Sequence, residues 1–112
     1  MLYASIVIFA LAAVMGLILI SKIIGKKETP KGVVIVHGLL AATGLIVLLL
    51  FAIDNADNKP KIALGFFAVA ALGGFYLLYR DLKGKAGPAA LAVLHAALAV
   101  TGFGILLFFA FG

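Results

Sequence analysis

The sequence predicts an all-α membrane protein, a four-transmembrane-helix up-down bundle made of two parallel tandem helical-hairpin repeats. Its 112 residues are 66% hydrophobic and 12% charged, whereas soluble proteins average roughly 45–50% apolar and about 25% charged residues. The apolar residues gather in four stretches, each close to the ~20 residues that cross a bilayer as a helix. A shift of 58 residues superimposes the second half of the chain on the first without a gap. We therefore expect one membrane domain, residues 1–112.

The four apolar stretches are, in chain order, Leu2–Ile24, Val33–Ile53, Ile62–Tyr79 and Ala89–Phe111. They are apolar on every side and do not alternate as barrel strands do, so each is predicted to be a helix. The first stretch has no basic region ahead of it and is expected to be an uncleaved anchor. Pro30 and Pro88 precede the second and fourth stretches, where the missing backbone donor costs little.

The internal repeat sets the expected topology. Residues 1–54 form the first repeat, 55–58 a linker and 59–112 the second repeat, with 17 of the 54 aligned pairs identical. Each repeat crosses the membrane twice, so both copies have the same orientation and their pseudo-two-fold axis lies along the membrane normal. Short connections favour neighbouring antiparallel helices. The second and fourth helices are then parallel and diagonal to each other.

The charged residues indicate the orientation. They all lie in the connections or at helix ends, and the first and third connections are strongly cationic while the second balances two acids and two bases. An excess of Lys and Arg belongs on the cytoplasmic side, so we expect both termini outside and the basic loops in the cytoplasm, with the bacterial inner membrane as location. The net charge of +5 is a topology signal that also suits anionic lipid head groups, and the pattern does not favour nucleic acid.

The identical pairs fall into one stripe on each helix. In the second helix the spacing is 3, 4 and 7 residues, which is one helical face. The stripes comprise Phe9, Ala12, Ala13, Gly16 and Leu19; His37, Leu40, Ala41, Gly44, Leu48 and Phe51; and their equivalents 58 residues later. Lipid-facing positions drift after a duplication, so we place the stripes inside the bundle. Gly16, Gly74, Gly44 and Gly102 are expected at comparable depths, where they draw the helices together or leave room for a flat group.

His37 and His95 are the only histidines, and each lies seven residues after its proline. An ionisable side chain inside a membrane segment is a functional candidate. On diagonal helices, on the order of 6–10 Å below the membrane boundary, two facing imidazoles can be the axial ligands of a haem. The alternative is that each histidine makes an interhelical hydrogen bond and binds nothing. A bare metal ion fits poorly, because Cys is absent and no Asp or Glu lies near.

This pattern resembles the four-helix, haem-carrying bundle of b-type membrane cytochromes, in which helices two and four carry paired histidines and helices one and three carry glycines. Gly16, His37, Gly74 and His95 match that order. The resemblance implies one haem b with two histidine ligands, and a redox partner protein or membrane complex. Two-haem members carry a second histidine 13 or 14 residues further on, where this chain has Leu50, Phe51, Phe108 and Phe109. The quinone-site motifs of the family are not recognisable.

The predicted site follows from these observations. His37 and His95 would hold the iron, and the residues around the porphyrin would be Gly16, Gly74, Gly44, Gly102, Ala41 and Ala99. Arg80 and Lys22 are the candidates for the propionates, Arg80 first because its fork suits a carboxylate, although positive-inside anchoring explains the same two cations. Thr43 and Thr101 are expected to bond the carbonyl one turn back.

The expected function is electron transfer, as a carrier or redox subunit rather than a stand-alone enzyme, since no nucleophile, base and orienting acid coincide. The alternative is a cofactor-free structural or accessory subunit of a larger membrane complex. Assembly into a homo-oligomer is compatible with both.

Overall fold

The computed structural model describes residues 1–112 and contains four α-helices and no strands. The helices are α1 (Leu2–Ile24), α2 (Lys31–Ile53), α3 (Lys59–Leu82) and α4 (Ala89–Phe111). The predicted all-α bundle is therefore confirmed. Helices α2 and α3 begin earlier than predicted, and α3 ends later, because an apolar run marks only the hydrocarbon-spanning part of a helix. Polar residues such as Lys59 and Arg80 continue α3 beyond that part.

Each helix is long and apolar enough to cross a membrane. At 1.5 Å per residue a helix of 23 residues is about 35 Å long, which exceeds the ~30 Å hydrocarbon layer. Large apolar side chains are exposed along all four helices, among them Leu17, Leu39 and Leu72. In water such a surface would be a liability, and lipid would cover it.

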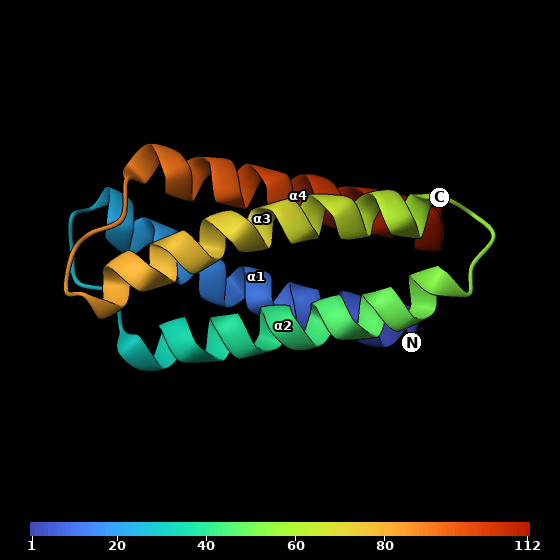
Figure 1. Ribbon diagram of the computed structural model, residues 1–112, viewed down its shortest axis with the longest axis horizontal. Helices are drawn as coiled ribbons and strands as arrows, with labels where there is room; N and C mark the ends of the chain where they lie inside the picture. Colours follow the sequence, from blue (N-terminus) through green and yellow to red (C-terminus); the bar gives the residue numbers. More distant parts are fainter.

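The helices form a ring in chain order. The two hairpins, α1 with α2 and α3 with α4, have the closest packing, and α2–α3 and α1–α4 contacts close the bundle. The diagonal pairs, including α2 and α4, have no close backbone approach. Figure 1 shows both termini and the α2–α3 connection at one end, here called the terminal end. The α1–α2 and α3–α4 connections lie at the other end, here called the basic end.

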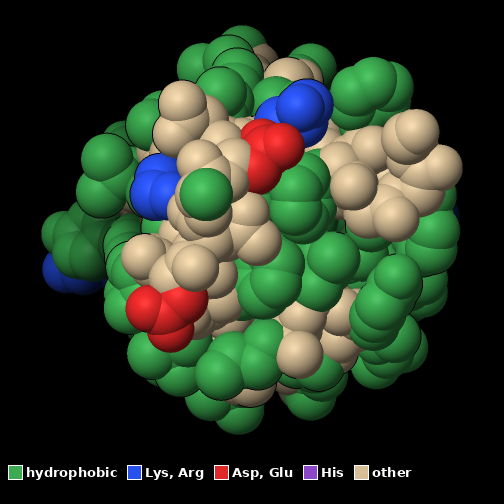
Figure 2. Space-filling model, turned by 90° about the vertical axis from the view of Figure 1, so that its right-hand side faces the viewer, with side chains coloured by type: hydrophobic (Ala, Val, Ile, Leu, Met, Phe, Trp, Pro, Cys, Tyr) green, Lys and Arg blue, Asp and Glu red, His purple; other side chains and the backbone are tan.

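The two ends differ in charge as the sequence predicted. Figure 2 views the terminal end, where acidic and basic side chains both lie on a mainly hydrophobic face. The α2–α3 connection supplies two acids and two bases to this end, Asp54, Asp57, Lys59 and Lys61. The sidedness of the bundle in the membrane remains a prediction from the excess of Lys and Arg at the basic end.

The core lies in the half of the bundle next to the terminal end. There the rings of Phe9 and Phe67 stack at a centroid distance of 3.9 Å and an angle of 3°. Leu48 and Leu106 are fully buried beside them. All four residues belong to the predicted inward stripes, whose placement is thereby confirmed at these positions, while Ala13 is an exception and is exposed.

The half of the bundle next to the basic end has far fewer buried residues. It comprises residues 13–24, 31–43, 71–82 and 89–101, and Ala92 is its only buried residue. No large side chain is buried there. Both histidines lie in this half and are half-buried.

The two hairpins are joined at the basic end by Asp81. Its carboxylate accepts a hydrogen bond from the Thr29 hydroxyl and lies 2.8 Å from the Lys31 ammonium. The repeat-equivalent positions are Ile23, Gly87 and Ala89, which offer no such pair. This contact therefore breaks the two-fold symmetry of the repeat.

We predict that Gly44→Ala destabilises the bundle. A Cβ at this position would lie 2.8 Å from Cε1 of Phe9, whose ring is held against Phe67. Overpacking of this kind costs about 1–3 kcal/mol. The matched control is Gly38→Ala on the same helix, where a Cβ would meet nothing within 4 Å. Unfolding by denaturant in detergent micelles should separate the two variants, and equal stability would contradict the packing described.

We also predict a pH-dependent contribution from Asp57. Its carboxylate accepts the backbone N–H of Lys59 at 2.8 Å at the start of α3, and this bond lowers the pKa of Asp57. A carboxyl whose pKa is lowered by folding stabilises the fold above its unfolded pKa, and loses that effect as the pH falls through the folded pKa. Asp57→Ala should therefore lower the thermal midpoint at pH 7, and the difference should shrink as the pH falls below about 4, the usual pKa of an aspartate. A difference that stays constant as the pH is lowered would contradict the assignment.

Candidate functional site

Each histidine is tied to the other helix of its own hairpin. His37 Nδ1 lies 2.8 Å from the Ala12 carbonyl oxygen, and His95 Nδ1 lies 2.6 Å from the Ala70 carbonyl oxygen. Both contacts join residues 25 positions apart. The second hairpin thus reproduces the contact of the first, and the repeat builds the two halves of one site.

These contacts fix the tautomer of both imidazoles. A carbonyl oxygen can only accept a hydrogen bond, so Nδ1 of each ring must carry the proton. In the neutral ring Nε2 then has a free lone pair, which is the atom that ligates a metal. Neither Nε2 forms a hydrogen bond with the protein. Histidines that bind metals usually donate their other N–H to a carbonyl or carboxylate in this way.

The two rings converge in the middle of the bundle. His37 and His95 are each six residues into their helices, which places them at equal depth, about 9 Å from the basic ends of α2 and α4. Their ring centroids are 6.3 Å apart and the ring planes cross at 78°. The bundle therefore brings two imidazoles from diagonal helices close together.

The predicted glycines occupy two levels, not one. A Cβ at Gly16 would lie 3.1 Å from Cε1 of His37, and one at Gly74 would lie 2.9 Å from Cε1 of His95. Gly44 instead faces Phe9, and Gly102 faces the backbone and side chains of α3 around Phe67. The expectation of comparable depths was therefore wrong. Gly44 is seven residues beyond His37 on α2, or about 10 Å along the axis.

The remaining predicted contacts lie close to the histidines. Ala41 and Ala99 are half-buried, one turn from the histidines towards the terminal end, and Ala99 packs on the core. Thr43 and Thr101 donate to the carbonyls of Leu39 and Ala97 at 2.8 Å, as predicted. Their hydroxyls are thereby satisfied within their own helices.

Of the two predicted cations, Arg80 makes side-chain hydrogen bonds within the protein, and Lys22 makes none. Arg80 Nη1 donates to the Tyr76 hydroxyl at 3.3 Å, and Nη2 donates to the Ala86 carbonyl at 3.1 Å. Lys22 is half-buried at the basic end of α1. Their pairing with haem propionates remains a prediction.

Sequence reasoning missed the protein groups that hold the site. The Ala12 and Ala70 carbonyls are backbone acceptors, and because every residue has a backbone carbonyl, the residue type gives no sign of this role. No group of three or more His, Cys, Asp or Glu side chains comes together in the chain. The candidate metal ligands at this place are therefore the two imidazoles.

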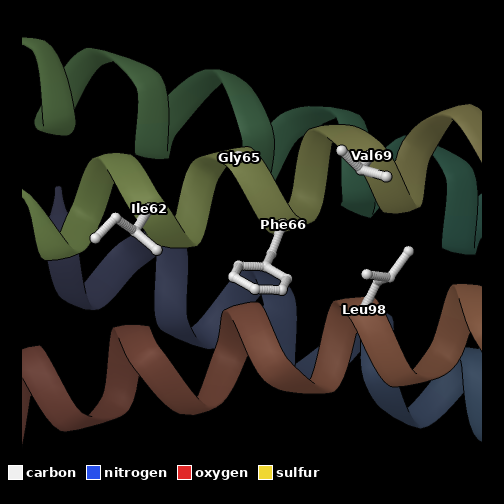
Figure 3. A pocket seen from close by; sticks show the side chains of 5 residues that line it. All are labelled: Ile62, Gly65, Phe66, Val69 and Leu98. Carbon is white, nitrogen blue, oxygen red and sulfur yellow. The ribbon is translucent and has the colours of Figure 1, made fainter.

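A separate apolar groove lies between α3 and α4 (Figure 3). It measures about 320 Å³ and is lined by Ile62, Gly65, Phe66, Val69 and Leu98. Leu98, which was predicted to face the bundle interior, is half-buried and also lines this groove. The groove contains no titratable side chain and offers no chemistry of its own.

Comparison of the chain with known protein families, with curated proteins and with solved structures finds no match.

We predict that Gly74→Ala displaces His95 from the Ala70 carbonyl. The added Cβ would lie 2.9 Å from the imidazole, closer than side chains approach each other, so the ring must move. Gly73→Ala is the matched control, because its Cβ would meet only ordinary contacts at 3.7 and 3.8 Å. The ¹⁵N shifts of labelled histidine report the Nδ1–H bond. Loss of the His95 signature in Gly74→Ala alone is expected, and an unchanged spectrum would contradict the geometry.

Proposed function

We propose that this protein is a membrane b-type cytochrome that binds one haem between His37 and His95 and transfers electrons. The observation that carries the proposal is the convergence of two imidazoles from α2 and α4, 6.3 Å apart, each with Nδ1 bonded to a helix carbonyl and Nε2 free. The repeat supplies two histidines in the same tautomer, and a haem iron would need one such ligand on each side of the porphyrin.

The packing around the histidines also supports the proposal. Large side chains are fully buried only in the terminal half, whereas the half that contains the histidines has no buried side chain larger than alanine. A porphyrin is flat and apolar, and the large side chains of this half are at most half-buried. The stacked rings of Phe9 and Phe67 lie next to this half, on the side of the histidines that faces the terminal end.

The chain's own groups would set the ligand strength. The Ala12 and Ala70 carbonyls hold the imidazoles in one orientation and raise the basicity of Nε2 through the Nδ1–H bond. A haem held by both histidines would supply a one-electron iron couple, with the protein leaving no ligand position for oxygen. Electron transfer is therefore favoured over oxygenase chemistry. The site is nearer to the basic end, where a redox partner would approach most closely.

Gly44 and Gly102 have a smaller part in this proposal than in the sequence prediction. Both lie at the Phe9–Phe67 level, so they support the core beneath the site. Gly16, Gly74, Ala41 and Ala99 remain the proposed porphyrin neighbours, and Lys22 a proposed propionate partner.

The alternative function is a cofactor-free accessory subunit. One observation favours it: each histidine already makes an interhelical hydrogen bond within its hairpin. Such bonds stabilise membrane helix pairs by about 1–2 kcal/mol at most. Under this alternative the free Nε2 atoms have no function, and each histidine serves only to join the two helices of its own hairpin.

The absorption spectrum tests the proposal. Protein purified from haem-replete membranes should carry one haem per chain, with a sharp Soret band and split bands on reduction. His37→Ala and His95→Ala should each reduce haem content by about tenfold or more, because one axial ligand is lost.

Thr101→Val is the matched control, since Thr101 is exposed on the histidine helix and bonds only its own backbone. It should keep the wild-type spectrum. Wild-type protein that neither carries haem nor takes it up would support the accessory subunit instead, as would haem content at the wild-type level in both histidine variants.

A further inference from the structure

A second cavity at the basic end of α3 is lined by two phenols and three cations. Its volume is about 330 Å³, and its lining residues are Tyr76, Tyr79, Arg80, Lys83 and Lys85. No carboxylate is among them. Tyr76 and Tyr79 are 44% and 55% exposed, so the cavity opens on the outer surface of the bundle rather than into the histidine site.

The three cations of this cavity have no acidic partner. The salt bridges of the protein are Lys31 with Asp81 and Lys59 with Asp57, and neither includes a cavity residue. Asp81 directly follows Arg80, but its carboxylate is engaged by Lys31 and Thr29. The positive charge of the cavity is therefore uncompensated by the protein.

Arg80 has a donor without an acceptor. Its two terminal nitrogens bond the Tyr76 hydroxyl and the Ala86 carbonyl, while Nε is buried and has no hydrogen-bond partner. Buried polar groups are nearly always hydrogen-bonded, so this unpaired N–H needs an explanation, and a bound ligand or water would supply one. The Tyr76 hydroxyl accepts from Arg80, so its own proton is free to be donated.

We propose that this cavity binds a phosphate-bearing anion, of the kind carried by the head group of an anionic phospholipid. Arginine presents a planar fork that matches phosphate oxygens, and the two lysines add point charges. Tyrosines at this position suit the interface, where phosphates and aromatic belts share one depth. Lys83 Nζ lies 5.2 Å from the centre of the Tyr79 ring, a cation–π contact that keeps the ammonium over the cavity rim.

The first repeat lacks this cavity and serves as an internal reference. The equivalent residues are Ile18, Ser21, Lys22, Gly25 and Lys27. Two cations are kept there, but both phenols and the third cation are absent. If the basic end attracted anionic lipid only through its overall charge, removal of Lys22 or of Arg80 would weaken lipid binding equally. If the lipid binds in this cavity, only the removal of Arg80 should weaken binding strongly.

The proposal is independent of haem binding, and it gives Arg80 a different ligand from the haem propionate that its position first suggested. The guanidinium lies among exposed tyrosines of the outer surface.

Native mass spectrometry of the full chain in detergent tests the site. The protein is titrated separately with phosphatidylglycerol, phosphatidylcholine and inorganic phosphate. We expect one tightly retained phosphatidylglycerol per chain and weaker retention of phosphatidylcholine. Arg80→Gln should weaken phosphatidylglycerol retention by about tenfold or more, because bonds to a charged group are lost. Tyr76→Phe, which removes only a hydroxyl, should weaken it in the same direction.

Lys22→Gln is the matched control and should leave retention within about twofold, because Lys22 does not line the cavity. Circular dichroism confirms that each variant keeps its helices. Equal losses in Lys22→Gln and Arg80→Gln would overturn the proposal, as would failure of wild-type protein to retain any of the three probes. Inorganic phosphate that binds as tightly as the lipid would keep the anion site but identify a free phosphate as its ligand.

Discussion

The imidazole–carbonyl hydrogen bond within each hairpin is the contact on which the arrangement of the site depends. In an α-helix the residue four positions after a carbonyl lies directly above it, and its side chain leans back over that carbonyl. At both acceptors this residue is glycine, Gly16 above Ala12 and Gly74 above Ala70. The missing Cβ uncovers the second lone pair of the carbonyl for the imidazole. Glycine, carbonyl and histidine therefore act as one unit, and the repeat contains it twice.

This unit explains why the site and the core lie apart. Without a hydrophobic driving force between helices in lipid, membrane bundles rely on close packing and polar contacts. Here the Phe9–Phe67 stack and the buried Leu48 and Leu106 supply the packing in the terminal half. The histidine bonds hold each hairpin together in the other half. The half that contains the histidines can thus do without large buried side chains, because the hairpins are fixed by polar contacts there.

Sequence reasoning predicted the parts that depend on periodicity and missed those that depend on helix register. The four helices, the inward stripes and the meeting of His37 with His95 all follow from apolar runs and 58-residue spacing. The two levels of glycine were missed, because relative depth depends on where each helix starts: α2 begins at Lys31, two residues before its apolar run. The direction of Arg80 was also unpredictable, because its partners are a flexible side chain and the carbonyl of Ala86 in a connection.

The repeat has been kept to different degrees along its length, and the structure gives the reason. Between residues 20 and 36 only Lys27 and Pro30 match their equivalents, whereas the stripes around the histidines and phenylalanines match at most positions. The histidine–carbonyl contact is made in both hairpins, so both copies of the residues that form it are needed. Contacts at the basic end are made by one copy alone, as in the tie from Asp81 to Lys31 and the cavity at Arg80. A duplicated hairpin can therefore keep a two-fold interior while its two basic ends diverge, since only the interior has to satisfy both halves at once.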